Sequence, residues 1–182
     1  EAHHAIAKRA AAEGAVLLKN EGGILPLQQG AKIAVIGAMA KSPRYQGAGS
    51  SHINPTGLSQ PLDFLPDAVY APGCDDRGDT TDALLDEARA AAEQAEVAVI
   101  FAGLPDRYES EGFDRDDMKM PAGHLRMIEA VVSANPHTVV VLLCGSAVEC
   151  PWADRVKAVL YMGLPGQAGG EAIAELLYGR VN

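Results

Sequence analysis

Short apolar runs rich in β-branched residues alternate with longer helical patterns along this chain. This alternation restricts the possible folds more than any other feature. The apolar runs cover residues 32–37, 97–102, 138–143 and 158–162, with a shorter one at 69–71. Uninterrupted runs of this length are typical of strands that are buried on both faces of a parallel sheet.

The helical patterns lie between these runs, at residues 80–94, 123–134 and 170–178, with a weaker one near 58–65. Strand and helix patterns in alternation indicate parallel strands joined by right-handed crossovers. The sequence therefore predicts an α/β fold, a three-layer sandwich in which a mostly parallel sheet of about five to six strands has helices on both faces.

The N-terminal region predicts a further helix over residues 2–18, because it is rich in alanine and its apolar residues recur at near-helical spacing. The run Glu21-Gly22-Gly23 should end this helix. We accordingly divide the 182 residues into an N-terminal helix with a lead-in segment, 1–31, and a sandwich, 32–182. Both ends of the chain indicate a piece of a larger protein.

Charge and composition exclude several classes of function. The formal net charge is −9 and no basic run is longer than Lys8-Arg9, so a nucleic-acid partner is not expected. No apolar stretch approaches the length of a membrane span. The three cysteines lack paired spacing, which predicts reduced thiols in or near the core rather than a metal site or a disulfide framework. We expect no cofactor.

Candidate functional residues lie in loops that follow strand ends and should therefore share one edge of the sheet. These loops are residues 39–55, 104–121, 145–152 and 163–170. The run Tyr108–Arg115 places three carboxylates and an arginine beside Gly112, either as a catalytic loop or as a solvated acidic surface. The glycines of 47–52 lack the spacing of a nucleotide-binding loop. Those of 163–170 lie at a strand-to-helix turn where an anion could bind, but close packing of a helix on the sheet is the stronger explanation.

Taken together and in order, these segments resemble the C-terminal domain of glycoside hydrolase family 3 over nearly the whole chain. The matching segments are Val16–Glu21 with Leu25–Leu27, Lys32–Gly37, Tyr45–Ser51, Tyr108–Arg115, Gly145-Ser146 with Glu149, Pro151 and Trp152, and Gly166–Gly170. Each segment is weak evidence alone, whereas the ordered set is specific.

The resemblance implies a six-stranded α/β sandwich that packs against an N-terminal (β/α)8 barrel, with the active site between them. Members of this family are mostly retaining exo-β-glycosidases, in which an Asp of the barrel attacks the anomeric carbon. A Glu of the sandwich protonates the departing oxygen, and Glu111 matches that general acid/base in the pattern E-x-E-G-x-D-R. The implied substrate is a terminal β-D-glycoside, such as a β-glucoside or an oligosaccharide.

The chemistry of a retaining glycosidase requires two carboxyl groups roughly 5 Å apart, one to attack and one to donate a proton. This chain matches only the second, so we expect the 182 residues alone to be catalytically silent or nearly so. Two alternatives stay open: a non-catalytic sugar- or nucleotide-binding module, and a structural domain whose loops only shape another domain's site.

Other residues of these loops are substrate-binding candidates. Arg44, Tyr45 and Gln46 should lie at the mouth of the cleft, and Ser50 and Ser51 near it, although turn formation explains the serines equally well. Glu109 is either a ligand for sugar hydroxyls or solvated. Asp114 and Arg115 should form an ion pair or loop clamp.

The resemblance also implies that a C-terminal continuation supplies the sixth strand of the sheet. The surface that would face the barrel should be exposed, so we expect self-association as a homo-oligomer. The resemblance is greatest to intracellular bacterial members, and unpaired cysteines fit a reducing compartment, so a cytoplasmic location is expected.

Overall fold

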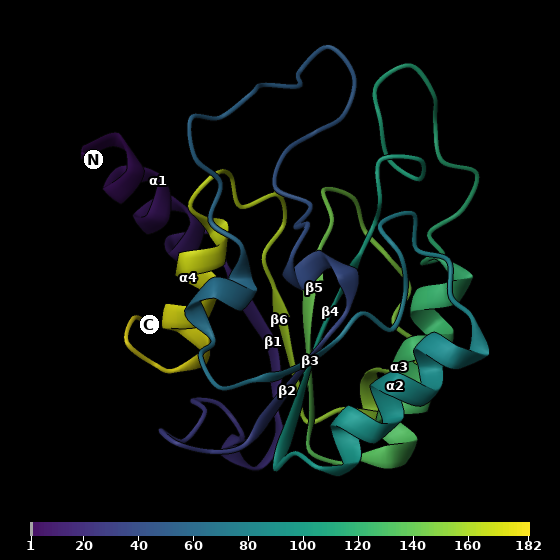
Figure 1. The fold of residues 1–182 in the computed structure, drawn as a ribbon. Helices are drawn as coiled ribbons and strands as arrows, with labels where there is room; N and C mark the ends of the chain where they lie inside the picture. Colours follow the sequence, from purple (N-terminus) through teal and green to yellow (C-terminus); the bar gives the residue numbers. More distant parts are fainter. Residues whose placement is uncertain (1) are drawn as a thin grey trace.

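The structure, a computed structural model, describes residues 2–182 and contains one six-stranded sheet in the order β1-β6-β5-β4-β2-β3 (Figure 1). The strands are β1 Val16–Asn20, β2 Ile33–Ile36, β3 Val69–Ala71, β4 Val97–Gly103, β5 Thr138–Leu143 and β6 Ala158–Tyr161. All neighbouring strands are parallel except the edge strand β1, which runs antiparallel to β6. The predicted α/β sandwich is confirmed.

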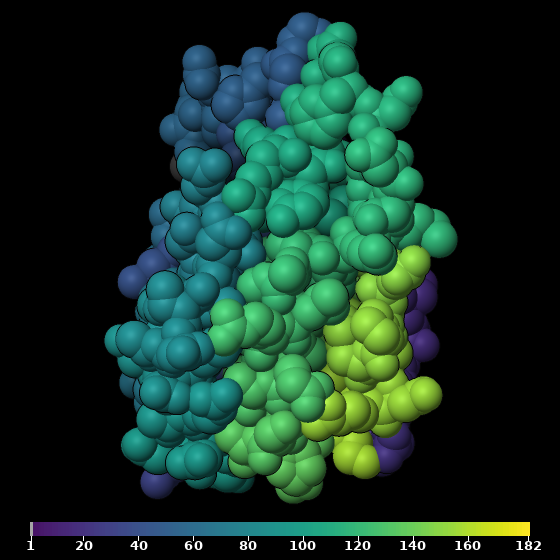
Figure 2. Space-filling view, turned by 90° about the vertical axis from the view of Figure 1, so that its right-hand side faces the viewer, coloured from purple at the N-terminus to yellow at the C-terminus, as the bar shows by residue number. Residues whose placement is uncertain are grey.

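Four helices in the described residues cover the two faces of the sheet. They are α1 Ala2–Glu13, α2 Asp82–Glu93, α3 Ala122–Ala134 and α4 Gly169–Leu177. Helices α2 and α3 lie together on one face, and α1 and α4 on the other (Figure 1). Figure 2 shows the surface that α2 and α3 form, with the 104–121 loop above them.

Successive residues of β4 show why the sheet has a core on each side. Ile100 packs in a cluster with Met127 and Ile128 of α3, whereas Phe101 packs in a second cluster with Ile173 of α4. All five side chains are fully buried. A strand points successive side chains to opposite faces, so an uninterrupted apolar run is what a sheet covered on both sides requires.

The helix predicted over residues 2–18 is wrong over its last five residues, 14–18. Helix α1 ends at Glu13, and Val16–Asn20 form β1, in which Val16 is paired with Tyr161 and Leu17 with Leu160. Backbone pairing with β6 outweighs the local helical preference here. The sixth strand thus comes from residues before the parallel strands, which corrects the expectation that a C-terminal continuation supplies it. The weak helix near 58–65 is a short 3-10 turn, Pro61–Phe64.

The loops at the carboxyl ends of the parallel strands gather at one edge of the sheet, where the 39–55 and 104–121 loops rise side by side (Figure 1).

All three cysteines are free, and Cys74 and Cys144 are buried. Within residues 2–182, no helix has both the length and the apolar character needed to cross a membrane.

Candidate functional site

Glu111 lies in the loop that follows β4, and contacts from the 39–55 loop hold it. Its backbone amide donates to the carbonyl oxygen of Ala48 at 3.1 Å. The amide of Ser50 donates to Oε2 of Glu111 at 2.7 Å, and the Ser50 hydroxyl donates to the same oxygen. These two hydrogen bonds favour the ionised carboxylate and lower the pKa of Glu111.

Gly49 makes this contact possible. Its φ of +95° is rarely adopted by other residues, and a Cβ at this position would lie 2.6 Å from Cβ of Glu111. Glu111 itself is exposed and lines a hollow of about 500 Å³ together with Ser50, Ser51 and Glu109. The hollow therefore presents a carboxyl group that has one oxygen held and the other, Oε1, without a hydrogen-bond partner in residues 2–182.

Arg44 lines the Glu111 hollow, but its side chain is mostly buried and clamps two loops together. Its side chain is only 5% exposed; Nη1 forms an ion pair with Asp106, and Nη2 donates to the backbone carbonyl of Glu109 at 2.8 Å. Nε of Arg44 is buried and has no hydrogen-bond partner in the described part of the chain. The guanidinium thus holds the start of the 104–121 loop, which carries Glu111, against the 39–55 loop.

Glu109 holds a third loop, residues 145–152, in place. Its Oε2 accepts from the amide of Gly145 at 2.9 Å, and its Oε1 accepts from the hydroxyl of Ser146. The carboxylate also lies 3.9 Å from Nη2 of Arg44. Both oxygens are engaged within the protein, so Glu109 anchors a loop and is not simply solvated, while its contact with a sugar hydroxyl stays a prediction.

Tyr45 and Gln46 close the 39–55 loop on itself. The Gln46 side chain accepts from the amide of Ile53 at 3.0 Å and donates to its carbonyl at 2.9 Å and to the Tyr45 hydroxyl at 2.7 Å. The two residues line a second hollow of about 500 Å³, which adjoins the Glu111 hollow through Arg44 and Gly47. Tyr45 and Gln46 are therefore placed beside the site, as the sequence predicts.

The remaining predicted residues have separate roles. Ser51 is exposed in the Glu111 hollow. Arg115 donates to the carbonyls of Ala147 at 2.9 Å and Lys119 at 3.1 Å, which makes it a loop clamp. Between residues 2 and 182, however, no ion pair joins Arg115 to the exposed Asp114; that part of the prediction is corrected, because the guanidinium faces backbone carbonyls instead.

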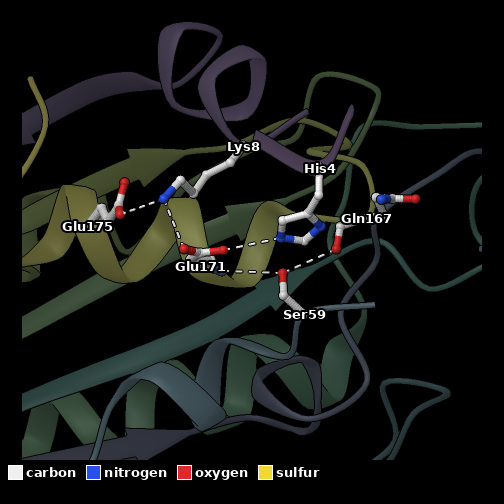
Figure 3. Close-up of polar contacts among 6 residues, drawn as sticks. All are labelled: His4, Lys8, Ser59, Gln167, Glu171 and Glu175. Atoms are coloured by element: carbon white, nitrogen blue, oxygen red, sulfur yellow. Dashed lines mark hydrogen bonds and ion pairs between the residues drawn. The ribbon is translucent and has the colours of Figure 1, made fainter. Parts of the chain in front are cut away.

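The glycine-rich turn at 163–170 is a packing feature. A Cβ on Gly170 would lie 2.5 Å from the carbonyl oxygen of Ser59. The amide and hydroxyl of Ser59 donate to the carbonyl of Gln167 at 2.9 and 3.1 Å, and its hydroxyl accepts from the amide of Glu171 at 3.3 Å (Figure 3). Ser59 thus satisfies a free amide at the start of α4, where an anion would otherwise bind.

Sequence reasoning missed two residues that organise the site, Asp106 and Ser146. Asp106 pairs with Arg44 and Ser146 with Glu109. The motif Gly145-Ser146 could have indicated the role of Ser146, whereas no local sequence pattern indicates that of Asp106. In residues 2–182, His, Cys, Asp and Glu side chains form no group of three or more that could hold a metal ion.

Comparisons with known proteins identify the family of this chain. The family model of the glycosyl hydrolase family 3 C-terminal domain matches residues 15–182. The chain is 52% identical over 190 residues to thermostable beta-glucosidase B of Acetivibrio thermocellus and 45% identical over 197 residues to an exo-alpha-(1->6)-L-arabinopyranosidase of Bifidobacterium longum. Both matches cover 100% of this chain, but only 25% and 26% of the relatives.

Solved structures are similar to this one as well. A family 3 beta-glucosidase of Bifidobacterium adolescentis superimposes with a TM-score of 0.94 at 46% identity, covering 99% of this chain and 27% of that structure. A beta-glucosidase of Streptomyces venezuelae in complex with D-glucose gives a TM-score of 0.90 at 28% identity, covering 98% of this chain and 37% of that structure. The chain spans about a quarter of the length of the curated relatives it matches.

Proposed function

This chain belongs to glycosyl hydrolase family 3 as a C-terminal domain, and on that basis we propose that it supplies the general acid/base, Glu111, to a retaining exo-β-glycosidase. One observation carries the proposal. Glu111 extends from the carboxyl edge of the sheet with its Oε2 held by Ser50 and its Oε1 open to the hollow.

A carboxyl group held in this way can carry out both proton transfers of a retaining mechanism. In the first step the protonated Glu111 gives its proton to the glycosidic oxygen while a carboxylate nucleophile attacks the anomeric carbon. In the second step the ionised Glu111 takes a proton from water as that water displaces the nucleophile. The loops around Glu111 are held together by buried contacts. These contacts give its carboxyl group a defined position.

The nucleophile belongs to a partner domain, which we propose to be an N-terminal (β/α)8 barrel of the same protein. The substrate is a terminal β-D-glycoside, with a glucoside favoured by the 52% identity to a beta-glucosidase. Because the second carboxyl lies outside these residues, the chain alone should not turn over aryl glycosides at the rate of the complete enzyme.

The test is replacement of Glu111 by Ala in the full-length glycosidase that carries this domain. Hydrolysis of substrates with poor leaving groups should fall about 10²- to 10⁴-fold, because these depend most on proton donation. Good leaving groups need little protonation, so azide should restore their turnover by attacking the anomeric carbon of the glycosyl-enzyme and yielding a β-glycosyl azide.

Glu87→Ala is a matched control, since Glu87 is exposed on α2 at a distance from the loops of the site. Its kinetics should match those of the unmodified enzyme with every leaving group. Unchanged kinetics for Glu111→Ala as well would contradict the proposal and leave the loop a purely structural role.

A further inference from the structure

Ser50 makes the most specific contact to the proposed acid/base. It lies on the 39–55 loop, 61 positions before Glu111 in the chain. Both of its donors, the backbone amide and the hydroxyl, are directed at Oε2, and neither bonds to Oε1. A carboxylate has two oxygens that are equivalent in water, and this contact makes them different.

We infer that Ser50 is a positioning residue, which holds Oε2 of Glu111 and so makes Oε1 the oxygen that gives and takes the proton. The inference rests on the proposed function and deepens it. The sequence left Ser50 either as a ligand of the substrate or as a turn residue. The geometry assigns it to the carboxyl group instead.

The surroundings of Glu111 leave Ser50 as the main influence on its protonation within this chain. The charged groups that line the same hollow are Arg44 and Glu109, which contact each other. Arg44 is also paired with Asp106, and the Glu109 carboxylate is bonded to Gly145 and Ser146. The pKa of Glu111 is lowered by the Ser50 hydroxyl first and by the Ser50 amide second.

The lowering of the Glu111 pKa by Ser50 has opposite consequences in the two steps of a retaining mechanism. Hydrogen bonds to the ionised form favour a base, which Glu111 must be when water attacks. In the first step Glu111 must be protonated, and the negative charge of a nearby nucleophile opposes the effect of Ser50. Glu111 becomes ionised when it gives its proton to the departing oxygen. The nucleophile loses its charge when it is esterified, and the Ser50 contact then stabilises the ionised Glu111 as the base.

The test is the pH dependence of kcat/KM for the full-length enzyme with Ser50→Ala. The basic limb reports ionisation of the free enzyme's acid. Removing a donor to the carboxylate raises the pKa of the acid, so the protonated form persists to higher pH. The basic limb should move up by about half a pH unit to one unit, since the backbone amide still donates.

Two variants separate positioning from a general structural effect. Ser50→Thr keeps the hydroxyl, so the basic limb of its kcat/KM profile should lie at the same pH as in the unmodified enzyme. Ser133→Ala is the control, because Ser133 is exposed on α3 and does not line the Glu111 hollow, and its basic limb should not move. A residue that only supports the fold would lower kcat/KM equally at every pH.

The result also distinguishes this inference from the proposed function. If Glu111→Ala abolishes turnover of poor leaving groups while the limb of Ser50→Ala stays in place, Ser50 has no positioning role and the acid/base assignment stands. If Glu111→Ala has no effect, both fail.

Discussion

Nη2 of Arg44 donates a 2.8 Å hydrogen bond to the backbone carbonyl oxygen of Glu109, across 65 positions of the chain. The same guanidinium pairs with Asp106, so one buried cation fixes two points on the loop that carries Glu111. Exposed ion pairs contribute little to stability, but a buried donor with several acceptors contributes more. The site therefore depends on a residue that does not face the solvent.

Replacing Arg44 by Met should destabilise the chain, because it removes the charged donor and leaves the Glu109 carbonyl and carboxylate without it. We expect a loss of about 2–3 kcal/mol in the free energy of unfolding, measured by urea denaturation of the 182-residue chain. The control is Arg89→Met, in which an exposed pair with Asp86 is lost; it should change stability by less than about 0.5 kcal/mol. Equal losses in the two variants would contradict the clamp.

Gly49→Ala should lower activity without unfolding the domain. The new Cβ would lie 2.6 Å from Cβ of Glu111, and φ of +95° is strained for alanine. Displacement of the proposed acid/base by about 1 Å should lower kcat of the full-length enzyme about a hundredfold. Gly57→Ala is the control, since a Cβ added to Gly57 would meet no atom within 4 Å and its φ is not positive. Comparable kcat values for the two variants would argue against close contact.

His124 should make the stability of the chain depend on pH. Burial lowers its pKa from 6.5 to about 4, although the carbonyl of Gly103, 3.0 Å from Nδ1, acts in the opposite direction. The unfolded chain therefore binds a proton more readily than the folded one between these values. The contribution of His124 to the free energy of unfolding is complete above pH 6.5 and is lost as pH falls toward 4. The total loss is about 3 kcal/mol.

The measurement for His124 is urea denaturation between pH 4 and pH 7, compared with a His124→Gln variant. The variant should be less stable at neutral pH and show a shallower decline as the pH falls. Parallel curves for the two proteins would mean that another group is responsible for the decline.

The attachment of α1 to α4 should be sensitive to salt. Lys8 bonds Glu171 and Glu175 at 2.9 and 2.8 Å, and His4 contacts Glu171 at 3.1 Å (Figure 3). Only Ala11 of this helix is buried, so polar contacts make up much of its attachment. Lys8→Met should increase hydrogen exchange in residues 2–13 several-fold at low salt, and high salt should produce the same increase in the unmodified chain.

The pKa of Glu171 is lowered, first of all by its hydrogen bond to Lys8. A carboxyl group with a lowered pKa stabilises the folded state above its unfolded pKa, and this contribution is lost as pH falls through the folded value. Protection of the α1 amides, measured relative to their intrinsic exchange rates at each pH, should therefore also fall under acidic conditions. Exchange that responds to neither salt nor acid would show that α1 is attached by apolar contacts.

The parallel strands could be predicted from the sequence alone, because an uninterrupted run such as Thr138–Leu143 suits only a position buried on both faces. The position of Glu111 in a loop at the carboxyl edge of the sheet was predictable too, since the order of strands and helices puts such loops together. Val16–Asn20 were misassigned, because their strand conformation depends on backbone pairing with β6, a partner more than a hundred positions away.

Which side chains serve Glu111 depends on the tertiary structure. Arg44 and Glu109 are charged residues in turn-rich loops, and in the sequence such residues are equally consistent with a solvent-facing and a substrate-facing position. The folded chain brings Ser50 to one carboxylate oxygen and buries Arg44 beneath the loop. A local pattern specifies how a segment folds, whereas hydrogen-bond partners 61 and 65 positions apart are specified by how the loops pack.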